Sequence, residues 1–342
     1  MKNEHVYGGC FVRCLIAGLG SIGTRHLRNI RALDPGGHVT VWHSRPRPAG
    51  QAGPDPAPGR VVFSLDEALY PRPDIAIIAS PAPFHLPAAL ALARRGVDLF
   101  IEKPLAAGMD GIDELLQLQV ENRIIVMVGY TLRFHPALQA VKACIGAGKI
   151  GRPLLLRADV GQYLPDWRPG TDYRVSVSAR SDLGGGAVRE LSHELDYARW
   201  LLGGVRSVTA RTGRVSDLAI DVEDSADIIL EFDSGAIGNI HLDMVQRPAT
   251  RSCRVTGTDG TVAWDAGENI VKFYANAEGR WSVLYQEVNP DRNAMYLAEL
   301  AHFLSCVRER KEPCITALDG KRALQIALSA LQSSREERRV YL

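Results

Sequence analysis

The feature that most constrains this chain is a glycine-rich turn between a predicted strand and a predicted helix. The apolar run 11–17 leads into Gly-Leu-Gly-Ser-Ile-Gly at 18–23, and helical spacing follows over 24–30. In that context the first glycine permits a tight turn, the second lets the backbone approach a pyrophosphate, and the third lets helix and strand pack closely. The helix N-terminus adds N–H groups and the positive end of a dipole. We therefore predict a dinucleotide site rather than an ordinary strand–turn–helix, with cofactor contacts from Gly18, Gly20, Ser21, Ile22 and Gly23.

Predicted strands and helices alternate up to residue 129. The run 74–79 is almost continuously apolar, which is typical of a strand covered on both faces. Further strands are predicted at 39–42, 61–63, 97–101 and 124–128, and helices at 65–70, 87–95 and 109–122. This alternation predicts an α/β fold in which residues 1–129 form a dinucleotide-binding Rossmann domain with a doubly wound parallel sheet.

The pattern changes after residue 129, where longer β-like stretches follow one another. Strands are predicted at 154–160, 205–212, 226–232, 236–243, 252–257, 261–265 and 270–274. Turn signals at 233–235 and 258–260 indicate hairpins in an antiparallel or mixed sheet. Helices at 136–147 and 188–202 would cover one face, and helices at 294–308 and 318–333 close the chain. We predict a second domain over 130–342, with the final helix as a candidate for packing back on the first.

Composition excludes several classes of partner. The 342 residues carry a formal net charge of +1, which gives no electrostatic reason to expect nucleic acid or an acidic membrane. The six cysteines show neither a CxxC pair nor a metal-ligand spacing with histidine, so we expect reduced thiols and no metal. No leader-like or membrane-spanning apolar run is present, so we expect a cytoplasmic protein.

Two short motifs follow predicted strands of the first domain. Glu102-Lys103-Pro104 comes directly after 97–101, and ligands of open α/β sheets bind beyond the carboxyl ends of strands. Lys103 is therefore a candidate for the reacting centre, although an isolated EKP would also fit a surface charge pair before a turn. Ser80, Pro81 and His85 follow the strand 74–79 and are predicted to line the nicotinamide side. His85 is equally well explained as a residue at the start of a helix.

A third motif places a histidine among carboxylates. After three glycines at 184–186, Glu190, His193 and Asp196 are spaced to share neighbouring faces of one helix. A carboxylate beside a histidine fixes its tautomer and adjusts its pKa, which suits a general acid or base. A lone helix histidine is more often simply half-buried, and the glycine run modestly favours the functional interpretation.

Together these motifs resemble those of one family. GLGSIGTRH, SPAPFH, EKP, GYTLRFHP and GGGAVRELSHELD, in this order and spacing, look like the Gfo/Idh/MocA family of NAD(P)-dependent oxidoreductases, and the similarity runs over nearly the whole chain. The resemblance implies a C-terminal α/β domain with a large open, mostly antiparallel sheet. That sheet would supply the substrate site and an interface for a homodimer or homotetramer.

The resemblance also implies roles for individual residues. Lys103 matches the lysine that contacts substrate and cofactor, and His193 matches the histidine that exchanges the hydroxyl proton. The family pattern has an aspartate four residues before that histidine, whereas here Glu190 stands three before it, so Glu190 and Asp196 compete as its partner. Glu102 is included among the predicted cofactor contacts.

An irregular loop after 154–160 is rich in aromatic and arginine side chains. Aromatic faces pack on sugar rings, and arginine binds carboxylate or phosphate, although the loop is equally well explained as structural. The loop resembles a branch of the family associated with sugar acids and surface glycans. The predicted substrate contacts are Arg133, Tyr163, Trp167, Arg168, Tyr173 and Asp196.

The end of the predicted strand 39–42 bears on cofactor choice. An acidic residue there would hold the ribose hydroxyls of NAD, but the chain has His43-Ser44-Arg45. Ser44 and Arg45 could bind the 2′-phosphate of NADP, so we predict NADP(H), with NAD as the alternative.

We predict an oxidoreductase that transfers a hydride between nicotinamide and a hydroxyl or keto carbon of a sugar, sugar acid or nucleotide-linked sugar. An inositol-type polyol dehydrogenase is the alternative substrate class. A non-catalytic cofactor-binding regulator and an NAD-dependent glycoside-cleaving enzyme are alternatives on the same fold.

Overall fold

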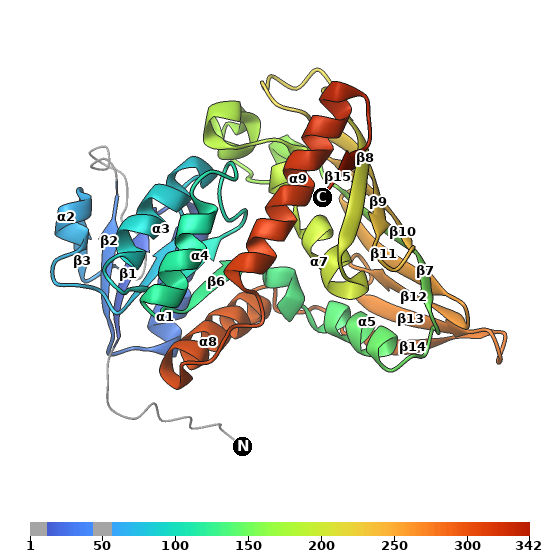
Figure 1. Ribbon diagram of the computed structural model, residues 1–342, viewed down its shortest axis with the longest axis horizontal. Helices are drawn as coiled ribbons and strands as arrows, with labels where there is room; N and C mark the ends of the chain where they lie inside the picture. Colours follow the sequence, from blue (N-terminus) through green and yellow to red (C-terminus); the bar gives the residue numbers. More distant parts are fainter. Residues whose placement is uncertain (1–11, 44–56) are drawn as a thin grey trace. The chain divides into compact units, whose positions relative to one another are not determined.

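The alternating elements of the first third form one parallel sheet. In the computed structural model, which describes residues 12–43 and 57–342, the strand order is β3-β2-β1-β4-β5-β6 and every pair is parallel (Figure 1). The strands are β1 (Arg13–Ala17), β2 (His38–Trp42), β3 (Arg60–Val62), β4 (Ile75–Ile78), β5 (Asp98–Glu102) and β6 (Val126–Gly129). The helices between them are α1 (Ser21–Leu33), α2 (Leu65–Ala68), α3 (His85–Ala93) and α4 (Ile112–Glu121). Every residue of β4 is buried, as its continuous apolar sequence predicts. The predicted Rossmann sheet is confirmed.

The second sheet has nine strands in the order β14-β13-β12-β11-β7-β10-β9-β8-β15. Only β7 and β10 pair in parallel, and the other neighbours are antiparallel, which confirms the mostly antiparallel sheet. The strands are β7 (Pro153–Gly161), β8 (Val205–Gly213), β9 (Ser225–Phe232), β10 (Ile237–Asp243), β11 (Thr250–Gly257), β12 (Gly260–Asp265), β13 (Ile270–Ala275), β14 (Arg280–Gln286) and β15 (Val340–Tyr341).

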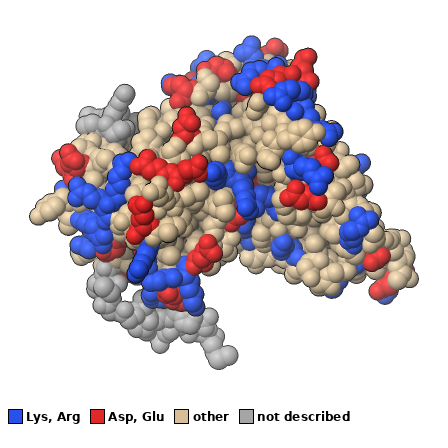
Figure 2. Space-filling model, viewed as in Figure 1, with Lys and Arg blue, Asp and Glu red and all other residues tan. Residues whose placement is uncertain are grey.

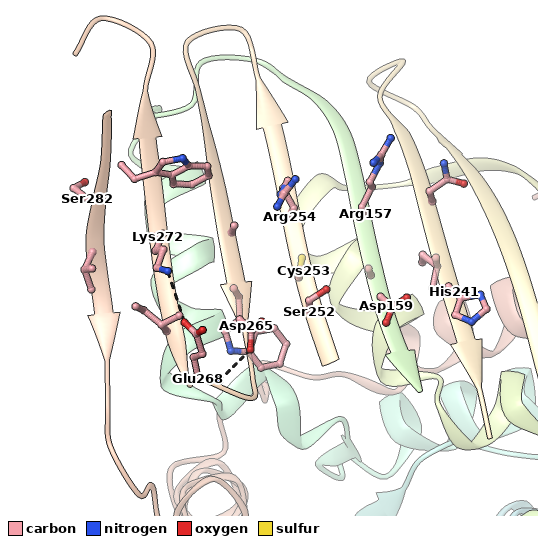
Figure 3. A pocket seen from close by; sticks show the side chains of 18 of the residues that line it. Arg157, Asp159, His241, Ser252, Cys253, Arg254, Asp265, Glu268, Lys272 and Ser282 are labelled. Carbon is pink, nitrogen blue, oxygen red and sulfur yellow. Dashed lines mark hydrogen bonds and ion pairs between the residues drawn. The ribbon is translucent and has the colours of Figure 1, made fainter. Parts of the chain in front are cut away.

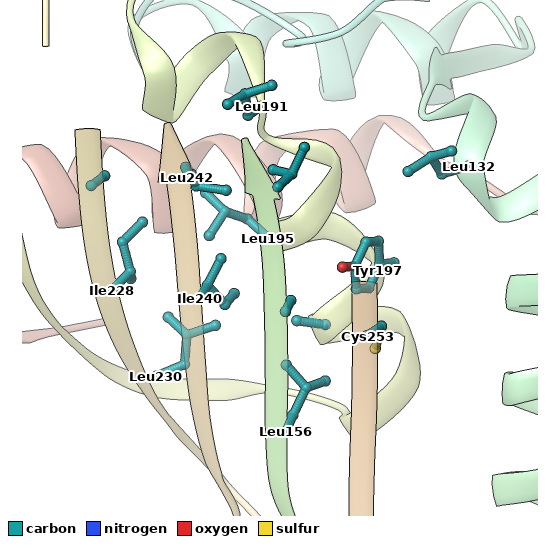
Figure 4. Close-up of a cluster of buried hydrophobic side chains, with 14 of the residues drawn as sticks. Leu132, Leu156, Leu191, Leu195, Tyr197, Ile228, Leu230, Ile240, Leu242 and Cys253 are labelled. Carbon is teal, nitrogen blue, oxygen red and sulfur yellow. The ribbon is translucent and has the colours of Figure 1, made fainter. Parts of the chain in front are cut away.

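Helices cover one face of the second sheet and enclose its core. These are α5 (Pro136–Gly146), α6 (Ala187–Glu190), α7 (His193–Leu202) and α9 (Ala317–Glu336). Figure 4 shows Leu195 and Tyr197 of α7 in this buried cluster, together with Leu156 of β7 and Ile240 of β10. Burial alternates along β10, so Ile237, Asn239 and His241 lie on the opposite, open face of the sheet, which carries apolar as well as polar side chains.

The described residues fall into two compact units whose boundaries differ in detail from the expected domains. The first comprises residues up to Gly129 together with Tyr296–Leu318, and the second comprises Tyr130–Met295 and Asp319–Leu342. Most of α8 (Ala294–Glu309) therefore belongs to the first unit, where Phe303 packs edge-on against Phe100 of β5 at 5.7 Å. The final helix α9 lies in the second unit.

The predicted helix over 188–202 is interrupted. Helix α6 ends at Glu190, Leu191 and Ser192 lie between the helices, and α7 begins at His193. The expectation that Glu190 and His193 share one helix face was therefore wrong. The leucine stripe that suggested one helix continues across the break, because Leu191 and Leu195 both reach the core.

Charges of both signs are mixed on the face of the molecule that Figure 2 shows. On the face shown in Figure 2, basic and acidic side chains lie among one another rather than in separate fields. In the described part of the chain, no helix combines the length and the apolar character needed to cross a bilayer.

Candidate active site

The glycine turn has the geometry that its sequence predicts. Gly18 has φ +96°, and a Cβ there would stand 2.7 Å from the Ser80 nitrogen and 2.8 Å from the Ala79 oxygen, so only glycine fits. A Cβ on Gly23 would collide with the Gly18 carbonyl. A Cβ on Gly20 would meet nothing within 4 Å. The turn is thus closed around Gly18 and Gly23 and open at Gly20, where a ligand can approach the backbone.

The start of α1 suits an anion. Ser21 and Ile22 are its first two residues, Gly20 provides no side-chain cap, and the first turn contains no acidic residue. The first N–H groups of a helix have no intrahelical acceptor, and its dipole is positive at this end. These residues therefore fit a dinucleotide pyrophosphate. Ser44 and Arg45 lie outside the described residues.

Three neighbouring strands bring the first unit's candidates to one edge. Strand β4 lies between β1 and β5, and all three run in the same direction. Gly18 follows β1, Ser80 and Pro81 follow β4, and Lys103 follows β5, so they share the carboxyl edge where ligands of such sheets bind. Half-buried Lys103 donates its backbone N–H to the carboxylate of its buried neighbour Glu102, at 3.2 Å.

His85 makes hydrogen bonds within the first unit. Its Nδ1 lies 2.9 Å from the Pro104 carbonyl oxygen and its Nε2 lies 2.6 Å from the Ser80 carbonyl oxygen. Burial lowers the pKa of His85, and the two carbonyls act in the opposite direction. The ring joins the segments after β4 and β5, which favours a positioning role over the predicted cofactor contact.

His193 lies half-buried at the beginning of α7, in the second unit. The ring of buried Tyr130 meets it edge-on, with centroids 5.7 Å apart and planes at 85°. Burial raises the pKa of Tyr130, so its hydroxyl stays neutral. Glu190, at the end of α6, accepts a 2.9 Å hydrogen bond from the Ser178 hydroxyl. Nothing in the sequence around Tyr130 predicts its contact with His193.

Asp196 and Arg133 pair with each other rather than standing open to a substrate. The guanidinium donates to both carboxylate oxygens, at 2.8 and 2.6 Å, and both side chains are buried. Arg133 also lies 3.5 Å from Asp319, which pairs with Arg199. Burial raises the pKa of Asp196 and the Arg133 charge opposes that rise. Because Asp196 is bound by Arg133, it is a weaker candidate than Glu190 for the acidic partner of His193.

The predicted aromatic substrate contacts pack mainly on the core of the second unit. Tyr163, Trp167 and Tyr173 are partly buried against the hydrophobic cluster. The Trp167 indole donates to the Gln162 carbonyl at 2.9 Å, and the Tyr173 hydroxyl accepts from the Ala219 amide at 3.1 Å. These contacts fit the structural interpretation of the loop.

Two arginines of the same loop are paired with nearby acids. Arg174 forms an ion pair with Asp172, and Arg180 forms one with Asp182. In both pairs two guanidinium nitrogens donate hydrogen bonds to the carboxylate at the surface. Arg168 is exposed. The pairings reduce the positive charge that this loop can offer to an anionic substrate.

The open face of the second sheet carries a groove of about 1020 Å³ (Figure 3). Side chains of both signs line it, among them Arg157, Asp159, His241, Arg254 and Lys272. His241 lies 2.8 Å from Asp227 and 3.2 Å from Asp243. No motif in the sequence predicts this groove.

The chain matches two parts of one protein family. Residues 12–130 match the description "Oxidoreductase family, NAD-binding Rossmann fold", and residues 138–263 match "GFO/IDH/MocA C-terminal domain". The chain belongs to the Gfo/Idh/MocA family. It is an NAD(P)-dependent oxidoreductase of the kind that acts on CH–OH groups.

Several characterised dehydrogenases are similar to this chain over nearly their full length. The chain is 28% identical to scyllo-inositol 2-dehydrogenase (NAD(+)) of Bacillus subtilis, over 95% of this chain and 94% of that protein. It is 26% identical to myo-inositol 2-dehydrogenase of Thermotoga maritima, over 97% and 98%. Levoglucosan dehydrogenase in complex with NADH shares the fold, with a TM-score of 0.87 at 19% identity over 97% of this chain and 99% of that one.

Proposed function

We propose that this member of the Gfo/Idh/MocA family oxidises a ring hydroxyl of a neutral cyclic polyol or sugar, or reduces the matching ketone. The observation that carries the proposal is the arrangement of Gly18, Ser80 and Lys103 at one edge of the parallel sheet. Inositol dehydrogenases are among the relatives that the chain matches. Lys103 belongs to the first unit and His193 to the second.

The proposed chemistry divides between these two side chains. In the direction of oxidation, His193 takes the hydroxyl proton, and Glu190 at the end of the preceding helix is its proposed acidic neighbour. The Lys103 ammonium would stabilise the negative charge that develops on a hydroxyl oxygen as it loses its proton. Bound nicotinamide would accept the hydride from the carbon. The glycine turn at 18–23 and the first turn of α1 would hold the pyrophosphate.

The pairing of arginines favours a neutral substrate. A sugar acid or nucleotide-linked sugar needs an available cation. Arg133, Arg174 and Arg180 each bind an acidic side chain of this chain, which leaves exposed Arg168 as the candidate cation of the loop. An inositol-like ring places no such demand on the site. We therefore prefer the cyclic polyol over the anionic sugar that the loop composition suggested.

Cofactor preference and assembly complete the proposal. The preference for NADP(H) rests on Ser44 and Arg45 and the absence of an acid at 43–45 in the sequence, and it stays a prediction. The open face of the second sheet, with its groove of mixed charges, is the proposed interface with a second copy.

A paired assay tests the function. Nicotinamide fluorescence would measure the dissociation constants of NADH and NADPH for the parent and for Arg45→Asp. Turnover would then be followed at 340 nm with inositols, neutral sugars and sugar acids. We expect cofactor-dependent turnover of a neutral ring polyol, with Lys103→Ala lowering kcat by about 10³-fold while cofactor affinity changes only a few-fold.

Other outcomes would redirect the proposal. Tight cofactor binding without turnover of any compound indicates a regulator, and turnover confined to sugar acids contradicts the neutral substrate. Release of a leaving group without net change in cofactor indicates glycoside cleavage. Preference for NADH would overturn the Ser44 and Arg45 prediction alone.

A further inference from the structure

A buried histidine on the cofactor helix contacts the residue before the proposed catalytic lysine. His26 of α1 is fully buried, and its Nε2 lies 2.6 Å from Oε1 of Glu102 at the end of β5. The His26 ring also packs edge-on against Phe100, two residues earlier on the same strand, with centroids 5.1 Å apart. The proposed function gives His26 no role.

The same carboxylate holds Lys103. The other oxygen of Glu102, Oε2, accepts the backbone N–H of Lys103 at 3.2 Å. The position opposite this oxygen is close-packed, because a Cβ on Gly129 would stand 3.2 Å from Oε2 and 3.2 Å from the Phe100 ring. Glu102 thus bridges α1 and Lys103, and the packing leaves it little freedom to rotate.

The tautomer of His26 follows from its surroundings. Nδ1 is buried without a hydrogen-bond partner among residues 12–43 and 57–342. A carboxylate oxygen only accepts hydrogen bonds, so the ring nitrogen that faces Glu102, Nε2, carries a proton and donates it. Full burial and this fixed tautomer argue against proton exchange with a substrate.

We propose that His26 is a positioning residue, which acts through Glu102 to set the place of Lys103 relative to the phosphate-binding turn at the start of α1. The inference rests on the proposed function of Lys103. It assigns a reason for histidine three residues after Gly23: the side chain joins the helix that would hold the cofactor to the strand end that carries the lysine. Misplacement of a reacting group by about 1 Å costs on the order of 100-fold in rate.

Amide hydrogen exchange tests the link without any activity. The readout is the exchange rate of the Lys103 amide, compared in the parent, His26→Leu and His26→Gln. Glutamine keeps an N–H donor for Glu102, whereas leucine fills space without one. We expect exchange at Lys103 to be at least about tenfold faster in His26→Leu and close to the parent rate in His26→Gln. Leu27→Ala, a buried neighbour on α1, is the control for general loosening of the helix.

A double-mutant cycle in turnover tests the consequence. His26→Leu is combined with Lys103→Met, and kcat and KM are measured for all four chains on the substrate found for the parent. We expect His26→Leu to lower kcat about 10- to 100-fold with little change in KM, and to have no further effect once Lys103 is Met. His26→Gln should restore kcat to within about threefold of the parent.

The two failures are distinguishable. If Lys103→Met leaves turnover unchanged, or no turnover is found, the proposed function fails and the catalytic part of this inference fails with it. If Lys103→Met acts but His26→Leu matches the parent, only the inference is overturned. The same holds if Leu27→Ala reproduces both effects of His26→Leu, or if the effects of His26 and Lys103 are additive.

Discussion

In the first unit the glycine turn is placed by backbone geometry, whereas in the second unit the candidate residues are surrounded by side-chain charge pairs. Gly18 excludes any Cβ at the turn, and Lys103 is held through its backbone N–H. By contrast, α7, which begins at His193, is tied down by the pairs of Asp196 with Arg133 and of Glu194 with Arg251. We therefore expect the stability of the first unit to respond most to added side-chain volume at the glycine turn, and that of the second unit to the loss of a buried charge.

The largest effect should come from the buried charges of the second unit. Replacing Arg133 with Met leaves the buried Asp196 carboxylate without its bidentate partner, and breaking such a pair costs about 3–5 kcal/mol. Urea unfolding followed by tryptophan fluorescence would measure the loss. Arg174→Met is the matched control, because Arg174 binds Asp172 on the exposed surface, where screening by solvent leaves such a pair little effect on stability. Equal losses for both variants would show that burial does not decide how much a charge pair stabilises the second unit.

A pair of glycine substitutions tests the first unit. Gly18→Ala should cost about 2–4 kcal/mol, because the new Cβ meets the Ser80 backbone and the positive φ disfavours alanine. Gly20→Ala should change the free energy of unfolding by less than about 1 kcal/mol, since its Cβ meets open space. Gly20→Ala should nevertheless weaken binding of whichever nicotinamide cofactor the parent prefers, because that open side is the proposed approach of the pyrophosphate. A stable Gly20→Ala chain with parental affinity would contradict this assignment.

The difference between a local backbone turn and distant charge pairs explains what the sequence could predict. The turn at 18–23 depends on neighbours in the chain and on strand direction, so its glycine pattern carries most of the information. Asp196 and Arg133 are 63 residues apart, and neither residue's surroundings in the sequence reveal their pairing. Their charges suggested substrate contacts because sequence alone does not show which charges neutralise each other on folding.

The interrupted helix before His193 shows the same limit. The leucine spacing over 188–202 favours one helix, and no proline marks the break. The start of α6 depends on a distant group, because the Val188 amide donates to the carboxylate of Glu223 at 3.1 Å. Strand β14 was not predicted, since most of its residues are exposed and it lacks a buried alternating face.

The smallest expected effect concerns pH and the open face of the second sheet. Hydrogen bonds to Asp243 and Asp227 raise the pKa of His241 to about 9, although partial burial opposes this. Since the pKa in the folded chain lies above the ordinary 6.5, the stabilisation is fully present below pH 6.5 and is lost as the pH rises through about 9.

His241→Gln should therefore lower the free energy of unfolding at pH 6 by up to about 1 kcal/mol, the upper range for partly exposed pairs, and have little effect at pH 10. Thermal unfolding across this range, at two protein concentrations, would separate the local effect from any loss of assembly. A parent–variant difference that stays constant from pH 6 to 10 would mean that the carboxylates hold the ring equally well in both protonation states. The contribution of His241 to stability would then come from packing rather than from charge, as the contribution of Gly18 does at the glycine turn of the first unit.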